Sequence, residues 1–343
     1  MRNWKPSPAF VFGEINEMST AVPRDMKVFD LFFDLQTLSW QSWQSVFYFS
    51  ADQSENRSPT AGKGNMSTVV LTEDVLRTQF LIQRLIHARR PLLLIGPTAS
   101  GKTTLIRHYL KSQDNVNKMT HLELISCSLA ATAARTQQYM EQRLNVTGRF
   151  TMAPPKGASL VFLFDDISMA SKDKWGHISQ NELLRQWLCY QGWYQTKSSA
   201  FRKVKDINIV ATVSLRNEKE LVDERLGWNF CTIGHLNSPG GHIEHIYSSI
   251  LTAYFANVPD KRLQLLAPGM ILKASLGLMD LLNVQLMPSP TNFLQQINYR
   301  HLLFILRGLV DAPPTNFSDA EELAVMWLHE ASRTILDRFP DSG

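Results

Sequence analysis

The pattern of hydrophobic and polar positions divides the chain into two regions. In the first, short apolar runs alternate with amphipathic stretches, and in the second only amphipathic stretches remain. The short runs predict strands at residues 92–95, 122–128, 159–164 and 207–212. The amphipathic stretches between them predict helices at 73–87, 104–110, 132–143 and 181–191. Strands that alternate with helices favour an α/β fold with a parallel sheet.

The ends of the chain follow different patterns. After about Pro239 the pattern is helical, with helices expected at 243–256, 267–283 and 299–309. These helices predict a helical lid after the α/β core. Near the N-terminus, a set of aromatic residues predicts a small packing layer: Phe29, Phe32, Phe33, Trp40, Trp43, Phe47 and Tyr48. Residues 51–67 are polar and predict an exposed loop, and Thr72 is expected to cap the first helix.

One loop carries a motif with a specific chemistry. The segment from Gly96 to Thr103 reads G-x-x-x-x-G-K-[ST] directly after an apolar strand, which is the pattern of a phosphate-binding loop. Gly96 and Gly101 allow a tight turn, Lys102 supplies a charge for the β- and γ-phosphates, and the Thr103 hydroxyl can ligate Mg²⁺. The alternative is a glycine-rich turn with an incidental lysine. The predicted nucleotide-binding residues are Gly96, Pro97, Thr98, Ala99, Ser100, Gly101, Lys102, Thr103 and Thr104.

A second candidate element lies at the end of the apolar strand 159–164, which runs into Asp165 and Asp166. In nucleoside triphosphatases with a phosphate loop, a carboxylate in this place holds Mg²⁺, and a second one can polarise the attacking water. We therefore expect Asp165 to be a metal ligand together with Thr103, and Asp166 to be the catalytic base. The alternative is a turn in which these carboxylates cap the backbone.

Composition narrows the class of protein. The chain has 343 residues, 44% hydrophobic content and a net charge of +4, values that fit a globular protein of two or three structural units. Its basic residues form no long block, so direct nucleic-acid binding is not expected. An uninterrupted apolar run of about eighteen residues is absent, so no membrane span is predicted. The three cysteines lack metal-site spacing.

The residues around the second element resemble a known family. The segments 165–169, 173–176, 181–188 and 192–194 resemble the motor of dynein heavy chains, in particular the third AAA+ module of the motor ring. The block from Glu182 to Trp193 is the most specific part, and the resemblance covers nearly the whole chain. It implies a P-loop AAA+ core, a parallel sheet sandwiched by helices, followed by a helical lid subdomain.

The resemblance also implies a division of the chain. Residues 1–66 would lead into the module, 67–237 would form the nucleotide-binding core, 238–312 the lid, and 313–343 the start of the next module. The resemblance implies that the chain is one part of a longer heavy chain and that this part alone cannot be a motor. The implied ligands are ATP and Mg²⁺, and the implied role is to gate or support minus-end-directed movement along microtubules.

The partners implied by the family are the neighbouring AAA+ modules of the same heavy chain. Through the full motor they include microtubules and the dynein intermediate and light intermediate chains. The location implied is the cytoplasm and cytoskeleton, including the axoneme of a cilium or flagellum. The residues do not distinguish a ciliary from a cytoplasmic parent motor.

Several positions depart from the family pattern. Ala99 and Ser100 replace a usual Gly-Thr in the phosphate loop, and Thr212 or Ser214 stands where a polar sensor residue is expected. Trp228 occupies the place of a candidate arginine finger, although Arg225 remains nearby. Arg300 matches the lid arginine that contacts the γ-phosphate in this family, and is therefore a second candidate catalytic residue.

Asp166 replaces the glutamate base of many AAA+ ATPases, and its side chain is one methylene shorter. The sequence therefore predicts Mg-ATP binding with slow hydrolysis or none. Two alternatives stay open: a free-standing AAA+ ATPase that remodels other proteins, and a nucleotide-dead structural module of the ring.

Overall fold

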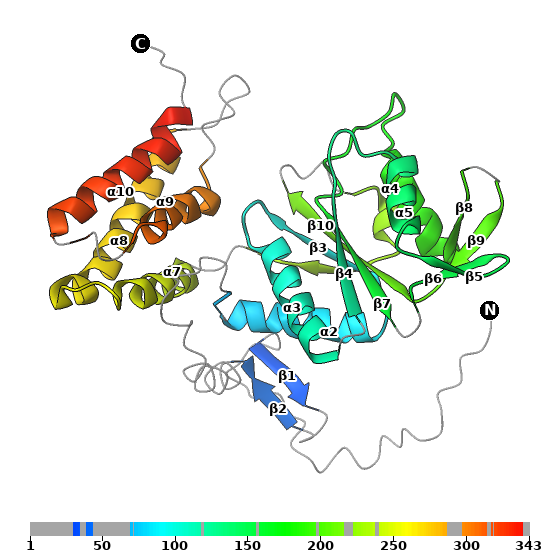
Figure 1. The fold of residues 1–343 in the computed structure, drawn as a ribbon, viewed down its shortest axis with the longest axis horizontal. Coiled ribbons are helices and arrows are strands. Elements are labelled where there is room, and N and C mark those ends of the chain that lie inside the picture. Colours follow the sequence, from blue (N-terminus) through cyan, green and yellow to red (C-terminus); the bar gives the residue numbers. More distant parts are fainter. Residues whose placement is uncertain are drawn as a thin grey trace.

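The computed structural model describes residues 30–34, 39–43, 69–70, 72–117, 120–155, 158–196, 199–215, 222–236, 240–286, 297–313, 317 and 319–338. Figure 1 shows an α/β body, coloured cyan to green, and beside it a helical body, coloured yellow to red. A small hairpin, in blue, lies below the α/β body.

The α/β body is built on a 5-stranded sheet with the strand order β11-β3-β10-β7-β4. Its strands are β3 (Leu92–Pro97), β4 (Thr120–Ser126), β7 (Ser159–Asp165), β10 (Ile207–Leu215) and β11 (Cys231–Gly234). All neighbouring pairs are parallel. Parallel pairing brings the carboxyl ends of β3, β7 and β10 to one edge. The predicted α/β fold with a parallel sheet is therefore confirmed.

Helices cover both faces of this sheet. Successive side chains of a strand point to opposite faces, so Leu92 and Leu94 pack with α2 (Glu73–His87) and α3 (Lys102–Asn117). Leu93 points to the other face, in the core formed with α4 (Ala133–Glu141) and α5 (Ser179–Tyr190). Strand β7 divides in the same way, because Val161 and Leu163 belong to the first core and Phe162 to the second. The strands read as continuous apolar runs because both of their faces are buried.

The N-terminal hairpin packs on the first helix. Strands β1 (Leu31–Asp34) and β2 (Ser39–Ser42) pair antiparallel. The rings of Phe32 and Trp43 lie 5.8 and 5.3 Å from that of Phe80 on α2. Thr72 caps α2 as predicted, because its side chain accepts the N–H of Val75. The predicted packing layer is confirmed for these residues, while Phe29, Phe47 and Tyr48 lie outside the described residues.

A second sheet decorates the core and was not predicted. It has four strands in the order β5-β6-β9-β8. They are β5 (Asn145–Gly148), β6 (Thr151–Ala153), β8 (Gly192–Tyr194) and β9 (Phe201–Val204), each only three or four residues long. Trp193 anchors it: the indole is fully buried, and its Nε1–H donates to Glu141 Oε1 at 2.8 Å. A short helix, α6 (Glu224–Gly227), follows the main sheet strand β10.

The helical body contains α7 (Gly240–Phe255), α8 (Lys261–Gln285), α9 (Tyr299–Asp311), α10 (Ala320–Ile335) and the 3₁₀ turn Leu336–Arg338. The lid was expected to end at residue 312, with the next module starting at 313. In the structure, however, Leu323, Ala331 and Ile335 of α10 are buried in the same core as Leu302 and Leu306 of α9. The apolar stripe of α10 therefore packs on α8 and α9, and the boundary at residue 312 stays a prediction.

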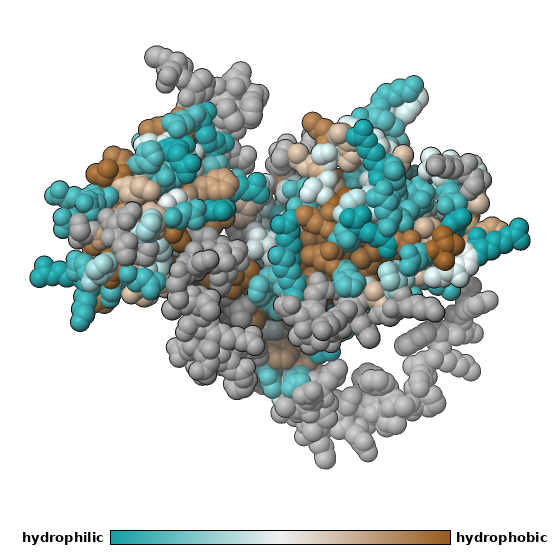
Figure 2. All heavy atoms as spheres, in the orientation of Figure 1, coloured by the Kyte–Doolittle hydropathy of each residue, from teal (hydrophilic) through white to brown (hydrophobic). Residues whose placement is uncertain are grey.

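Helix α8 bears on the expectation that no segment spans a membrane. Within the described part of the chain, α8 is long and apolar enough to cross a membrane by length and composition. Its sequence is not an uninterrupted apolar run, because it contains Lys273 and Asp280. Part of its apolar surface is used in packing, since Leu263, Ile271 and Leu272 lie in the lid core. Figure 2 shows brown, apolar residues at the surface of both bodies, interspersed with teal, hydrophilic ones.

Candidate nucleotide-binding site

The predicted phosphate loop joins β3 to α3 at the carboxyl edge of the sheet. Strand β3 ends at Pro97 and α3 begins at Lys102, so the loop turns within a few residues. Ala99 has φ +65° and Gly101 has φ +89°, both in the left-handed region. A Cβ at Gly96 would lie 1.9 Å from the carbonyl oxygen of His235. Glycine is required at 96 by this close approach and is favoured at 101 by its backbone angle.

Lys102 folds back over the loop. Its ammonium donates to the carbonyl oxygens of Gly96 (3.0 Å) and Pro97 (2.7 Å) and lies 3.5 Å from the Ser100 hydroxyl. Only 5% of the residue is exposed. Burial lowers the pKa of Lys102, while the charges of Asp166 and Asp165 raise it and that of Arg300 lowers it. The Lys102 ammonium thus lies near Asp165 and Asp166, the two carboxylates that the sequence predicts to be site residues.

The side chains proposed as metal ligands are in direct contact. Thr103, in the first turn of α3, donates to Asp165 Oδ1 at 2.6 Å. Thr212 of β10 donates to the same oxygen at 2.8 Å. Carboxylate and hydroxyl oxygens are the hard ligands that Mg²⁺ prefers. The donor set that Thr103 and Asp165 present therefore suits that ion, and Thr212 fixes the carboxylate from the neighbouring strand.

Asp166 is held by a separate pair of hydrogen bonds. Its backbone N–H donates to Thr212 Oγ1 at 2.9 Å, and the Ser214 hydroxyl donates to Asp166 Oδ1 at 2.6 Å. Its φ is +53°, a left-handed conformation that Asp adopts more readily than most residues. Thr212 and Ser214, the two candidates for the sensor position, thus each hold one of the two carboxylates.

Arg300 lies in the first turn of α9, where Asn298 caps the helix by accepting the Arg300 N–H at 3.0 Å. The side chain belongs to the lid and is exposed. Its charge nevertheless lowers the pKa of Lys102, so the structure brings it within electrostatic reach of the phosphate loop.

A cleft of about 430 Å³ separates the phosphate loop from the lid. The core contributes Pro97, Thr98 and Leu215, and the lid contributes residues of α7, α8 and the start of α9. The lid residues include both apolar and polar side chains: Ile243, Glu244, Leu276, Met279, Asp280, Asn283, Ile297, Asn298 and Tyr299. This volume lies in the range of small-molecule and cofactor pockets. Sequence reasoning missed these lid residues, because nothing in their local pattern separates them from other helix positions.

The comparisons with known proteins decide the family. Residues 59–238 match the P-loop containing dynein motor region. The chain belongs to this family. The match covers the described core from α2 to β11, including every residue of the phosphate loop.

Curated dynein heavy chains are similar to nearly the whole chain. The Dynein-1-beta heavy chain of the flagellar inner arm I1 complex from Chlamydomonas reinhardtii is 26% identical over 330 residues, which is 95% of this chain and 7% of the relative. Dynein axonemal heavy chain 1 from Rattus norvegicus is 27% identical over 282 residues, 79% of this chain and 6% of the relative. The ciliary dynein beta chain of Tripneustes gratilla is 25% identical over 319 residues, 92% of this chain and 7% of the relative. The chain thus spans a small fraction of these dynein heavy chains.

One departure from the dynein pattern is visible at the surface. Trp228, at the place expected for an arginine finger, follows α6 and is 92% exposed. Arg225 is also exposed, and its backbone N–H is accepted by Asp223, which caps α6. The segment therefore presents an indole and one guanidinium to its surroundings.

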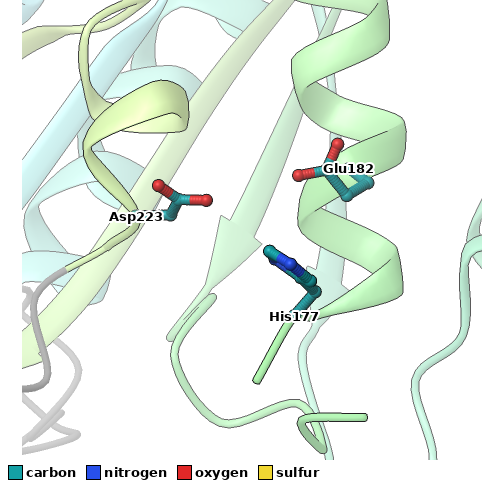
Figure 3. A group of neighbouring side chains, drawn as sticks. All are labelled: His177, Glu182 and Asp223. Carbon is teal, nitrogen blue, oxygen red and sulfur yellow. The ribbon is translucent and has the colours of Figure 1, made fainter. Parts of the chain in front are cut away.

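A further cluster of ligand-type side chains lies outside the dynein phosphate loop. Figure 3 shows His177 from the loop before α5, Glu182 from α5 and Asp223 from the cap of α6 pointing toward one another, and their ligand atoms lie within 4.8 Å of one another. Both carboxylates already have partners, because Glu182 pairs with Arg185 at 2.8 Å and Asp223 caps α6. All three side chains are at least partly exposed, so we assign no metal to them.

Proposed function

We propose that the chain is a nucleotide-binding module of a dynein heavy chain that takes ATP with Mg²⁺. The proposal rests mainly on one observation: three residues predicted from the sequence, Lys102, Thr103 and Asp165, lie close together. Lys102 lies buried in the phosphate loop, and the next residue, Thr103, contacts Asp165 at the end of β7. A glycine-rich turn with an incidental lysine would not require this contact between distant parts of the chain.

Each group has a distinct task in this proposal. The loop residues 96–104 bind the phosphates through backbone N–H groups, and the dipole of α3 favours the negative charge. Thr103 and Asp165 would hold the Mg²⁺, which would offset the charge of the phosphates. The nucleoside lies in the cleft between Thr98 and the lid. Arg300, at the start of α9 on the lid side of the cleft, would contact the γ-phosphate.

We propose slow hydrolysis or none. Asp166 is the candidate base, but the Ser214 hydroxyl donates to one of its oxygens, and its shorter side chain limits its reach. These two features favour a module that binds nucleotide and regulates the ring rather than one that drives it.

The place in the ring and the wider context are also proposals. The block Glu182–Trp193 favours the third AAA+ module, with the core at 67–237 and the next module following the lid. Through the full heavy chain the module would gate minus-end-directed movement along microtubules, with neighbouring modules and the intermediate and light intermediate chains as partners. Relatives named flagellar, axonemal and ciliary favour an axonemal parent.

Equilibrium binding of a fluorescent ATP analogue with Mg²⁺ tests the proposal. We expect micromolar binding by the unchanged chain and loss of that binding in Lys102→Ala. Lys111→Ala is the matched control, because Lys111 is an exposed lysine on the same helix. Equal binding by all three proteins would place the analogue elsewhere. A folded chain that does not bind would favour the nucleotide-dead structural module.

A further inference from the structure

His235 is a buried histidine that touches the phosphate loop, and the proposed function gives it no task. It directly follows β11 and is 5% exposed. Its backbone N–H donates to Ile95 O of β3 at 2.7 Å, so the residue continues the pairing of the two strands. Its ring Nε2 lies 2.9 Å from the carbonyl oxygen of Ser100, within the phosphate loop. Its Nδ1 lies 3.4 Å from Thr78 Oγ1 on α2.

The partners of the ring decide where its proton lies. The Ser100 carbonyl can only accept, so the hydrogen bond requires a proton on Nε2. Burial lowers the pKa of His235, and although the Ser100 carbonyl and Asp74 raise it, the charge of Lys102 lowers it further. The ring is therefore neutral near pH 7, and its single proton lies on Nε2. The Nδ1 lone pair then lies 3.4 Å from Thr78 Oγ1, whose own proton is donated to the carbonyl oxygen of Asp74 at 2.8 Å.

This hydrogen bond orients the peptide between Ser100 and Gly101. The C=O of one residue and the N–H of the next belong to one planar unit and point in opposite directions when the bond is trans. The structure has no cis peptide bond in its described part. Holding the Ser100 C=O toward His235 therefore turns the Gly101 N–H away from His235, to the side on which a phosphate loop presents its N–H groups.

The two residues on either side of Ser100 make a support from outside the loop important. Ala99 precedes Ser100 and adopts φ +65°, a conformation that costs an L-residue free energy which glycine avoids. Gly101 follows with φ +89° and has no side chain to pack against a neighbour. The peptide between two such residues is prone to rotate unless a partner outside the loop fixes it.

We propose that His235 is a positioning residue for the phosphate loop. Its Nε2–H holds the Ser100 carbonyl toward His235 and so fixes the Gly101 N–H in the direction of the nucleotide phosphates. The inference rests on the proposed nucleotide site. His235 does not touch the nucleotide. It acts through the backbone of Ser100, with α2 and β11 as the rigid support.

Two variants of the 343-residue chain test the proposal. His235→Leu removes the donor and keeps an apolar side chain of moderate size, whereas His235→Gln keeps an N–H near the position of Nε2. We expect His235→Leu to bind the fluorescent ATP analogue about 5- to 10-fold more weakly, the effect of one lost hydrogen bond. We expect His235→Gln to recover most of that affinity.

A control on the same strand separates positioning from packing. Ile233→Ala removes apolar contacts of β11 but leaves the histidine in place. Urea unfolding reports the stability of every variant. Weaker binding by His235→Leu but not by Ile233→Ala supports the proposal. Equal weakening by both at equal stability overturns it, and so does a His235→Gln protein no better than His235→Leu.

Nitrogen NMR of the imidazole ring provides a readout that does not involve nucleotide. We expect the neutral tautomer with hydrogen on Nε2, and hydrogen on Nδ1 overturns the proposal. The failures of the two proposals differ. If Lys102→Ala abolishes binding and His235→Leu binds normally, only the role of His235 is wrong. If the unchanged chain does not bind, both proposals fall.

Discussion

The Thr103 hydroxyl donates a hydrogen bond of 2.6 Å to Asp165 Oδ1, joining the first turn of α3 to the end of β7. The two residues belong to adjacent halves of the proposed site and are 62 positions apart in sequence. The contact places hydroxyl and carboxylate oxygens side by side. A cation that replaced the hydroxyl proton as the partner of Asp165 would need little rearrangement of either side chain.

Asp165→Asn should therefore affect the metal more than the nucleotide. The amide keeps the size of the side chain and an oxygen for Thr103, but it removes the negative charge. We expect the Mg²⁺ concentration for half-maximal nucleotide binding to rise by about 10-fold or more. Titration of Mg²⁺ into chain and fluorescent nucleotide measures this shift. Asp311→Asn, a surface carboxylate paired with Arg307, is the control, and an unchanged Mg²⁺ requirement in Asp165→Asn would remove the metal role.

Asp166→Asn separates binding from hydrolysis. Asn tolerates the left-handed φ of +53° as well as Asp does, so the fold should be kept. Nucleotide affinity should stay the same. A general base contributes about 100-fold or more to rate, so any ATPase rate of the chain should fall by about that factor. Phosphate release over hours is the measurement, and a rate that persists at its original value would show that Asp166 is not the base.

Ala99→Gly tests the strain in the phosphate loop. The left-handed conformation costs an alanine about 1 kcal/mol, which glycine does not incur. Glycine also gains freedom in the unfolded chain, about 0.4–1 kcal/mol, so the expected net stabilisation is a few tenths of a kcal/mol. Ala324→Gly, at an exposed interior position of α10, should instead destabilise by about 1 kcal/mol. Urea midpoints of the two variants should move in opposite directions, and a shared loss of stability would argue against strain at Ala99.

The elements that could be predicted from the sequence are those with a local signal. Helix α2 has both a cap at Thr72 and an apolar stripe, and its predicted bounds match Glu73–His87. Strand β7 could be predicted because an apolar run buried on both faces is continuous. Strands β8 and β11 could not, because segments of three or four residues form strands only through their partners β9 and β3.

The site residues follow the same rule: those with a local sequence signal could be predicted, and the others could not. The motif gave the loop and Lys102, and the apolar strand before the two carboxylates gave Asp165 and Asp166. His235 has no motif, since its importance comes from burial and from a contact with Ser100 across 135 positions. The lid residues of the cleft were missed for a related reason: which helix face meets the core depends on tertiary packing and not on helical periodicity.

The pH dependence of stability follows from buried groups that the fold keeps neutral. Burial lowers the pKa of His235 and of His301 below the ordinary 6.5. Below about pH 6.5 these histidines bind protons more readily in the unfolded chain than in the folded chain. The free energy of unfolding therefore falls as pH decreases. Burial also raises the pKa of Cys127 to about 12 from 9.0 and that of Tyr254 to about 12 from 10.0. Above about pH 9 the unfolded chain loses these protons first, so stability falls again as pH increases.

We therefore expect the urea midpoint to be highest between about pH 6.5 and 9 and to decline on both sides. Two variants test which groups cause the decline at low pH (the acid limb) and at high pH (the alkaline limb). His235→Gln should make the acid limb shallower and leave the alkaline limb unchanged, because it removes one histidine that binds a proton more readily in the unfolded chain than in the folded one. Cys127→Ala should do the reverse. A midpoint that rises between pH 7 and 5 in the unchanged chain would mean that groups stabilised by protonation dominate, contrary to the burial of His235 and His301.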